Sequence, residues 1–330
     1  MSLWGSPGLF LMIVYPLSRE LIKPTKEFMG MLMGFIDGDG YFDIGEQKQY
    51  NKKTKALVKS TIRIRLASNV HVRDLSLLEY FVKTLGVGKI STMSPGKVGR
   101  DQVRVIFSKK DLVTVIIPLI KEYKLQFLTS QRIKQFALCN YILNNSILLW
   151  EDLKYTETGI KPKTSEDLVK LSFYRDWLIG FTIAVGSFGF KAVGSAFYSL
   201  KQKGVENYPI IKAINLRILG REARPIKPDS ADCYQLTLTS KEDLQKVVDF
   251  FSPNLDSLSL LPPHPLQKGT NLLEQRGEQR EKEKETNLLY GYKLCQYILW
   301  LTELKISKRY SNLKPKILSI LNNEKHKHTN

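Results

Sequence analysis

The chain has 330 residues, of which 43% are hydrophobic, and carries a formal net charge of +18 at pH 7. It is long enough to bury a proper core and to hold two domains or pseudo-repeats. The surplus of lysine and arginine points to a polyanionic partner, with solubility or membrane-surface binding as the alternatives. Three widely spaced cysteines, Cys139, Cys233 and Cys295, indicate neither a disulfide framework nor a CxxC metal site. We expect them to be buried apolar residues.

The first segment, residues 1–25, is expected to be a leader or a remnant. Its apolar run, residues 8–15, ends at Pro16 and is too short to span a bilayer, which needs about 20 residues. No positive residue precedes the run and no clear small-residue cleavage site follows it, so a signal peptide is not favoured.

A glycine stripe marks the next segment, residues 30–42, which read GMLMGFIDGDGYF. Gly30, Gly34 and Gly38 recur every four residues, so on a helix they form one smooth face. Three glycines inside a helix, each costing about 0.8 to 1 kcal/mol relative to alanine, need a packing reason. We predict a helix that ends at Asp39, with Gly40 as its stop.

Strands and helices are predicted to alternate after this helix. A strand begins over residues 41–45 and is followed by the polar, lysine-rich residues 47–59. Residues 60–67, STIRIRLA, alternate strictly, which predicts a half-buried strand with a basic outer face. Residues 102–107, QVRVIF, repeat that pattern. Helices are predicted over residues 74–85, closed by Gly86 and Gly88, and over residues 111–123 and 130–147.

The second half of the chain echoes the first. Residues 176–190, DWLIGFTIAVGSFGF, repeat the small spacing at Gly180 and Ala184, which predicts a partner helix for the glycine stripe. Residues 103–112 and 234–244 share a strand, a turn and a helix start, which favours an internal repeat. The polar residues 151–166, interrupted by glycine and proline, are the expected linker.

Residues 255–330 comprise three segments of different composition. Residues 255–287 hold three prolines and a mixed-charge run, so we expect a solvated, mobile insertion, with a nucleic-acid-contacting arm as the alternative. An apolar helix is predicted over residues 288–304. The basic residues 305–330 are expected to be a loose electrostatic tail.

Two motifs in these segments make the chain similar to a known family. Residues 32–40, LMGFIDGDG, resemble the signature of the LAGLIDADG homing endonucleases and maturases, and residues 178–186, LIGFTIAVG, resemble a degenerate second copy. The spacing matches single-chain, two-repeat members. The resemblance implies an α+β fold of two pseudo-symmetric αββαββα-type repeats, over residues 26–150 and 167–304. Two glycine-striped helices would meet at the interface, and antiparallel sheets would form a DNA-binding saddle.

The resemblance also implies a metal site. One acid at the eighth position of each motif supplies metal ligands in this family, and those positions here are Asp39 and Val185, with Gly38 assigned to the same site. Valine binds no metal, and the sixth positions, Asp37 and Ile183, offer no substitute acid in the second motif. Magnesium is the expected cofactor, with occupancy weakened by the missing acid.

The family also places a lysine near each active site. Lys293 matches that position in the second half, although an ordinary solvent-facing helix residue is the alternative. In the first half the position is Gln131 or Ala137, depending on the register. The nearby Arg132 and Lys134 are the candidates to compensate.

Nucleic-acid contacts are expected on the outer faces of the strands. Gln47, Arg63 and Arg65 are candidates for base edges in the major groove, as are Lys201 and Gln202 in the second half. The lysines of residues 52–55 are expected to contact phosphates. Merely solvated strand faces are the alternative. The full set of candidates is Gln47, Lys52, Lys53, Lys55, Arg63, Arg65, Arg104, Lys201 and Gln202.

These features favour a nucleic-acid-binding scaffold with weakened or lost cleavage, acting as an RNA-splicing maturase. The alternatives are an active homing endonuclease that cuts both strands or nicks one, and a decayed reading frame. The expected partners are duplex DNA with a long asymmetric target and the chain's own group I intron RNA. A monomer without a membrane span is expected, in a mitochondrial setting suggested by the resemblance alone. The four histidines show no zinc-binding context, and no GxxxxGK loop occurs.

Overall fold

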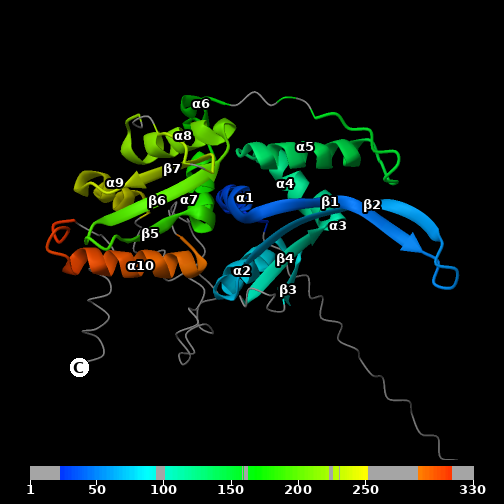
Figure 1. The fold of residues 1–330 in the computed structure, drawn as a ribbon, viewed down its shortest axis with the longest axis horizontal. Coiled ribbons are helices and arrows are strands. Elements are labelled where there is room, and N and C mark those ends of the chain that lie inside the picture. Colours follow the sequence, from blue (N-terminus) through cyan, green and yellow to red (C-terminus); the bar gives the residue numbers. More distant parts are fainter. Residues whose placement is uncertain are drawn as a thin grey trace, which may run out of the picture.

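The computed structural model describes residues 23–93, 101–157, 159, 163–222, 226–229, 231–251 and 289–313. Two α+β units flank a central pair of helices, α1 (Lys26–Asp39) and α7 (Tyr174–Val185), as Figure 1 shows. Their antiparallel sheets confirm the α+β fold class. The expectations for the leader before residue 23, for the insertion at residues 255–287 and for the tail after residue 313 lie outside the described residues.

The first unit holds a four-stranded antiparallel sheet in the order β1-β2-β4-β3. Helix α5 packs beside β1, and α2 carries its apolar face into the core. Its elements after α1 are β1 (Gly40–Tyr50), β2 (Leu57–His71), η1 (Val72–Asp74), α2 (Leu75–Leu85), β3 (Lys89–Met93), β4 (Gln102–Ser108), α3 (Lys109–Asp111), η2 (Leu112–Ile116), α4 (Ile117–Glu122) and α5 (Ser130–Asn144).

The second unit repeats this plan with a smaller sheet, in the order β5-β6-β7 within the described residues. Helix α10 runs beneath this sheet in Figure 1, α8 lies above it, and α9 lies at its left end. Its elements are α6 (Ser165–Val169), α7, β5 (Ser187–Phe190), β6 (Ala196–Lys203), η3 (Val205–Asn207), α8 (Tyr208–Leu219), β7 (Cys233–Leu238), α9 (Lys241–Phe251) and α10 (Gly291–Ile306).

The β1–β2 hairpin is longer than the alternation predicts. Its pairing runs from Gly40 opposite Ser68 to Tyr50 opposite Leu57, so most of the lysine-rich stretch is strand. Beyond residue 46 both faces of the hairpin are exposed, and Figure 1 shows it reaching past the rest of the unit. A strand exposed on both faces carries no apolar alternation, which is why the pattern ended early.

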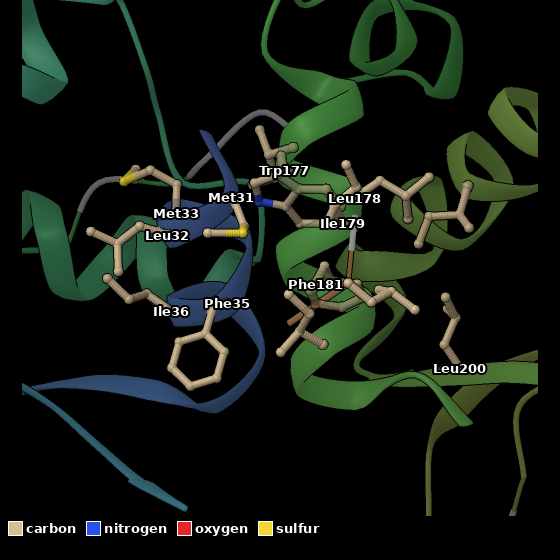
Figure 2. Packing of buried hydrophobic residues seen from close by; sticks show 14 of the residues in the cluster. Met31, Leu32, Met33, Phe35, Ile36, Trp177, Leu178, Ile179, Phe181 and Leu200 are labelled. Carbon is tan, nitrogen blue, oxygen red and sulfur yellow. The ribbon is translucent and has the colours of Figure 1, made fainter. Parts of the chain in front are cut away.

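The helix pair packs through its small residues, as the glycine stripe predicts. A Cβ at Gly34 would lie 1.8 Å from the carbonyl oxygen of Trp177, and a Cβ at Gly180 would lie 1.8 Å from that of Met31. A Cβ at Gly38 would meet that of Ala184 at 2.4 Å. Figure 2 shows large side chains of both helices packed around this contact. The two backbones therefore touch directly, which only glycine permits.

Gly40 ends α1 as predicted, with an extended φ of −87°, and a Cβ there would meet Ile36 at 2.7 Å. Two other local expectations need correction. The basic tail is not loose from its start, because α10 continues to Ile306 and Tyr310 is buried beneath β6, where its hydroxyl accepts from the Ala196 N–H. Of the cysteines, Cys139 alone is fully buried.

Two boundaries also differ slightly. Thr164 caps α6 within the stretch expected to be linker, so the second unit begins before residue 167. The helix expected over residues 111–123 widens into a π turn, η2, before α4. In the described part of the chain, none of the helices combines the length and apolarity needed to cross a membrane.

Candidate active site and nucleic-acid interface

A cavity of about 230 Å³ lies at the foot of the helix pair. Asp39 enters it from the end of α1, Ile183 and Ala184 from α7, and Lys293 from α10. Asp74, Asn69 and His71 also line this cavity, and no sequence pattern groups these three residues with the motif. Asp74 stands where the predicted helix starts, a position that indicates capping rather than chemistry.

The Asp39 carboxylate keeps contact with solvent at the mouth of this cavity. Burial of the carboxylate by the surrounding walls nevertheless raises the pKa of Asp39 to about 6. The positive charges of Lys293 and Arg132 lower this pKa, and the negative charge of Asp74 raises it. An oxygen ligand held in this way fits a divalent cation, which would lower that pKa by its own charge. Gly38 lies in the last turn of α1, where carbonyl groups have no intrahelical donor.

Asp37 has a structural role. Its buried carboxylate accepts from the backbone N–H groups of Leu128 and Thr129, from the Thr129 hydroxyl and, at 2.7 Å, from the Trp177 indole of α7. Burial raises its pKa to about 6, against the lowering effect of these donors. Asp37 therefore ties α1 to both the start of α5 and the partner helix.

Arg132 is the cation that the first unit places near these acids. Its buried guanidinium donates to the Ile36 carbonyl at 3.3 Å and to Gln135 at 2.5 Å. Burial lowers its pKa, while the nearby charges of Asp37 and Asp39 raise it. Lys134, the other candidate, lies instead 2.6 Å from Glu157 at the surface.

The pseudo-symmetry fixes the register that the sequence left open. The Tyr292 N–H at the start of α10 donates to Asp74, and the Ser130 N–H at the start of α5 donates to Asn207, each at 2.9 Å. Lys293 therefore corresponds to Gln131 and not to Ala137. The reciprocal glycine contacts of the helix pair likewise match Asp39 with Val185.

Lys293 is half-buried, which disfavours the solvent-facing alternative. Its ammonium donates to the Gly186 carbonyl at the end of α7, at 2.6 Å. Burial lowers its pKa, and the charges of Asp74 and Asp39 raise it. The side of the helix pair that holds Asp39 thus carries an acid and a lysine, whereas the matching positions on the other side are Val185 and Gln131.

The outer face of the first sheet is polar. Ile64 and Leu66 point into the core, and Arg63 and Arg65 alternate with them on the other face, together with Gln47 of β1. Arg63 is already engaged by Asp43 through two hydrogen bonds of 2.8 and 3.1 Å, and this pairing raises its pKa. Of the two arginines, only Arg63 has a carboxylate partner in the described chain.

Arg104 lies on the same face as Arg65. Its guanidinium donates to the Tyr41 hydroxyl at 2.8 Å and stands over that ring at 5.8 Å from its centre. One guanidinium nitrogen, Nε, is buried without a hydrogen-bond partner. The lysines at positions 52, 53 and 55 are exposed in the turn that closes the hairpin, where Asn51 accepts from the Lys53 N–H.

The second sheet corrects one candidate. Lys201 is exposed on the outer face of β6, opposite Gln235. Gln202 is two residues from buried Leu200 on β6 and pairs with buried Tyr234 on β7. Its side chain therefore lies on the core-facing side of the sheet. Adjacent strand residues point to opposite faces, so both cannot read one groove. Lys203 shares the face of Lys201 and is the better candidate.

Comparison with known proteins agrees with this geometry. The model of the LAGLIDADG endonuclease family matches residues 32–142, which span most of the first unit. A probable intron-encoded endonuclease of Schizosaccharomyces pombe, Cox1-I1b, is 29% identical over half of this chain and 42% of its own length. A probable intron-encoded endonuclease of Dictyostelium citrinum, aI3, is 23% identical over 69% of this chain and 88% of its own.

Solved structures extend the likeness to the second unit. I-SmaMI bound to an uncleaved DNA target with calcium ions aligns with a TM-score of 0.57 and 18% identity, covering 89% of this chain and 96% of its own. The LAGLIDADG meganuclease I-CpaMI aligns with a TM-score of 0.52 and 18% identity, covering 70% and 88%. At this identity the likeness concerns the fold. The matched residues 32–142 and the shared fold make this chain similar to the LAGLIDADG endonucleases, and the helix-pair geometry agrees with that similarity.

Proposed function

We propose that this chain is a site-specific nucleic-acid-binding protein in which double-strand cleavage is impaired. The observation that carries the proposal is the asymmetry at the C-terminal ends of the helix pair: α1 ends in Asp39, and its pseudo-symmetric counterpart at the end of α7 is Val185. A pseudo-twofold scaffold presents one half of its active site to each strand of a duplex, because the two strands are themselves related by a twofold axis. If one half of the active site lacks an acid, the strand that it faces has no metal ligand from that half.

Magnesium is the cation that we propose for the half of the active site that holds Asp39. The Asp39 carboxylate and the Gly38 carbonyl would hold it, and it would supply an activated water and charge neutralisation at the phosphate. Val185 contributes no oxygen. Losing one acid from a shared site is expected to cost about 3 kcal/mol of transition-state stabilisation, or roughly a hundredfold in rate.

Binding is proposed to use the two outer sheet faces. Arg65 and Lys201 are the best-placed side chains for base edges, since both are on outer faces and neither forms an ion pair in the described chain. Arg63 would first have to leave Asp43 or to present its remaining donors. The exposed lysines of the hairpin turn suit phosphates, which fix position but carry no sequence information. In the part of the chain that the structure describes, the two sheets differ in size, which suits a long asymmetric target.

The proposed biological role is that of a maturase that binds its own group I intron RNA and assists splicing. Two kinds of observation support it: the curated relatives carry the description "intron-encoded", and the site here retains a basic binding surface beside a depleted metal site. A mitochondrial setting is part of the same proposal. Because one chain provides both halves of the scaffold, we expect it to act as a monomer.

Slow endonuclease activity is the second candidate. The cavity that holds Asp39 and Lys293 favours it, because a carboxylate and an ammonium group there could serve one scissile phosphate. Under this alternative the protein nicks one strand, or cuts the second strand slowly.

A restoring substitution tests the proposal. A duplex recovered from a randomised pool by retention on the protein is end-labelled on each strand, incubated with magnesium and run on a denaturing gel. We expect Val185→Glu to raise cleavage of the second strand about a hundredfold, with Val185→Leu as the matched control. A native protein that already cuts both strands as fast as Val185→Glu would contradict the impaired site. Binding of intron RNA that survives Asp39→Asn, together with splicing in its presence, would support the maturase role.

A further inference from the structure

The start of α10 is held by the first unit rather than by its own cap. Tyr290, at the N-cap position, makes no side-chain capping hydrogen bond. The Tyr292 N–H instead donates to Asp74 Oδ1 at 2.9 Å, and the Arg73 guanidinium stands over the Tyr292 ring at 5.1 Å from its centre. Asp74 therefore caps, from a distant part of the chain, the helix that carries Lys293.

The other side of the pseudo-twofold provides a natural comparison. Asn207 precedes α8 as Asp74 precedes α2, and it accepts from the Ser130 N–H at the start of α5, also at 2.9 Å. Its amide nitrogen donates to the Lys203 carbonyl. A neutral amide is thus sufficient to hold a helix start in this fold. The negative charge of Asp74 needs a different explanation.

That charge faces the candidate active site. Asp74 lines the cavity together with Asp39 and Lys293, and its carboxylate interacts favourably with the Lys293 ammonium and unfavourably with Asp39. Among the residues that line the cavity, Asp39 and Asp74 are the two carboxylates, and Lys293 is the lysine. Without Asp74, the ammonium would have Asp39 as its remaining counter-charge there and would compete with a metal for it.

We propose that Asp74 is a positioning residue for phosphodiester cleavage at Asp39: it fixes the first turn of α10 and supplies the counter-charge that keeps the Lys293 ammonium at the cavity without occupying Asp39. The inference builds on the proposed residual cleavage on the Asp39 side. Asp74 acts through Lys293 and is not assigned a contact with the substrate.

The key variant is Asp74→Asn, which can keep the hydrogen bond from Tyr292, as Asn207 does for Ser130, while removing the charge. Asp167→Asn is the matched control, because this exposed acid also lies in the first turn of a helix, accepts from Thr164, and is outside the cavity. Three quantities are measured: the urea midpoint, the affinity for the duplex selected above, and the single-turnover rate of strand cleavage with magnesium.

We expect Asp74→Asn to lower the cleavage rate about 10- to 100-fold, as removal of a positioning partner commonly does, with affinity and urea midpoint unchanged. Asp167→Asn should match the native protein in all three. In a Lys293→Met background, Asp74→Asn should have little further effect, because its action passes through Lys293.

Several results would overturn the inference. An Asp74→Asn rate within twofold of the native rate, or a rate loss accompanied by an equal loss of affinity, would leave Asp74 with a merely structural role. Failure of Asp74→Asn to fold would contradict the comparison with Asn207. A native protein that retains the duplex and never cuts it would refute the positioning role while leaving nucleic-acid binding intact. If no duplex is retained at all, the proposed function itself fails.

Discussion

The backbones of the two units touch at Gly34, as they do at Gly180, and Gly34→Ala is expected to separate them. The new Cβ would stand 1.8 Å from the Trp177 carbonyl oxygen and 2.8 Å from the Phe181 nitrogen, where real Cβ atoms essentially never approach within 3.0 Å. Both obstacles are backbone atoms in the middle of α7, so no side-chain rotation relieves the overlap. The helices must move apart by more than 1 Å.

The loss in free energy of unfolding follows from the packing between α1 and α7 that this movement disrupts. Overpacking a well-filled core costs about 1–3 kcal/mol, and here the obstacle is rigid, so the upper end applies. Separating the helices also loosens the packing of Met31, Phe35 and Trp177 shown in Figure 2. Alanine returns about 1 kcal/mol in helix propensity. We therefore expect a net loss of about 2–4 kcal/mol, or roughly 5–10 °C in the melting temperature.

Urea and thermal unfolding, followed by circular dichroism and tryptophan fluorescence, measure this loss. Gly159→Ala is the control, because a Cβ there meets nothing within 4 Å. Coincident transitions from both probes are needed before a single free energy is quoted for a chain of two units. If Gly34→Ala were as stable as the native chain, direct backbone contact between α1 and α7 would be refuted.

Three further predictions follow from the site. Asp37 has its pKa raised from 3.8 to about 6 by burial, so its contribution to stability is fully present below pH 3.8 and is lost as the pH rises through 6. Between pH 7 and pH 4 the native chain should gain at most about 3 kcal/mol relative to Asp37→Asn; equal pH profiles from urea unfolding would contradict this. Trp177→Phe removes the indole donor at 2.7 Å and should cost about 1–3 kcal/mol, measured by the same unfolding; a smaller loss would mean that water replaces the donor. Lys53→Gln should lower the slope of log affinity against log salt by about 0.9 if it contacts a phosphate, while Arg65→Gln should also relax base preference at one position of the target.

Local patterns predicted much of the fold because helix and strand periodicities are set by neighbouring residues. The glycine spacing identified the two interface helices, and the alternation of residues 60–67 placed Arg63 and Arg65 opposite Ile64. The same patterns failed where a segment has no apolar face to repeat, as in the outer part of the β1–β2 hairpin. At Gln202 the strand period itself contradicts the prediction, because adjacent residues of β6 point to opposite faces and Lys201 and Gln202 cannot share one.

The sequence alone determined the motif, the interface helices and the valine at position 185, because each of these is a matter of residue type at a short spacing. Only the tertiary structure brought Asp74 beside Lys293, more than two hundred residues away in the chain, and surrounded Asp37 with donors from two elements. The physical reason is that such neighbours are selected by how helix starts and sheets pack across the pseudo-twofold. No local period encodes that packing, so the charges that share the cavity become visible only in the folded chain.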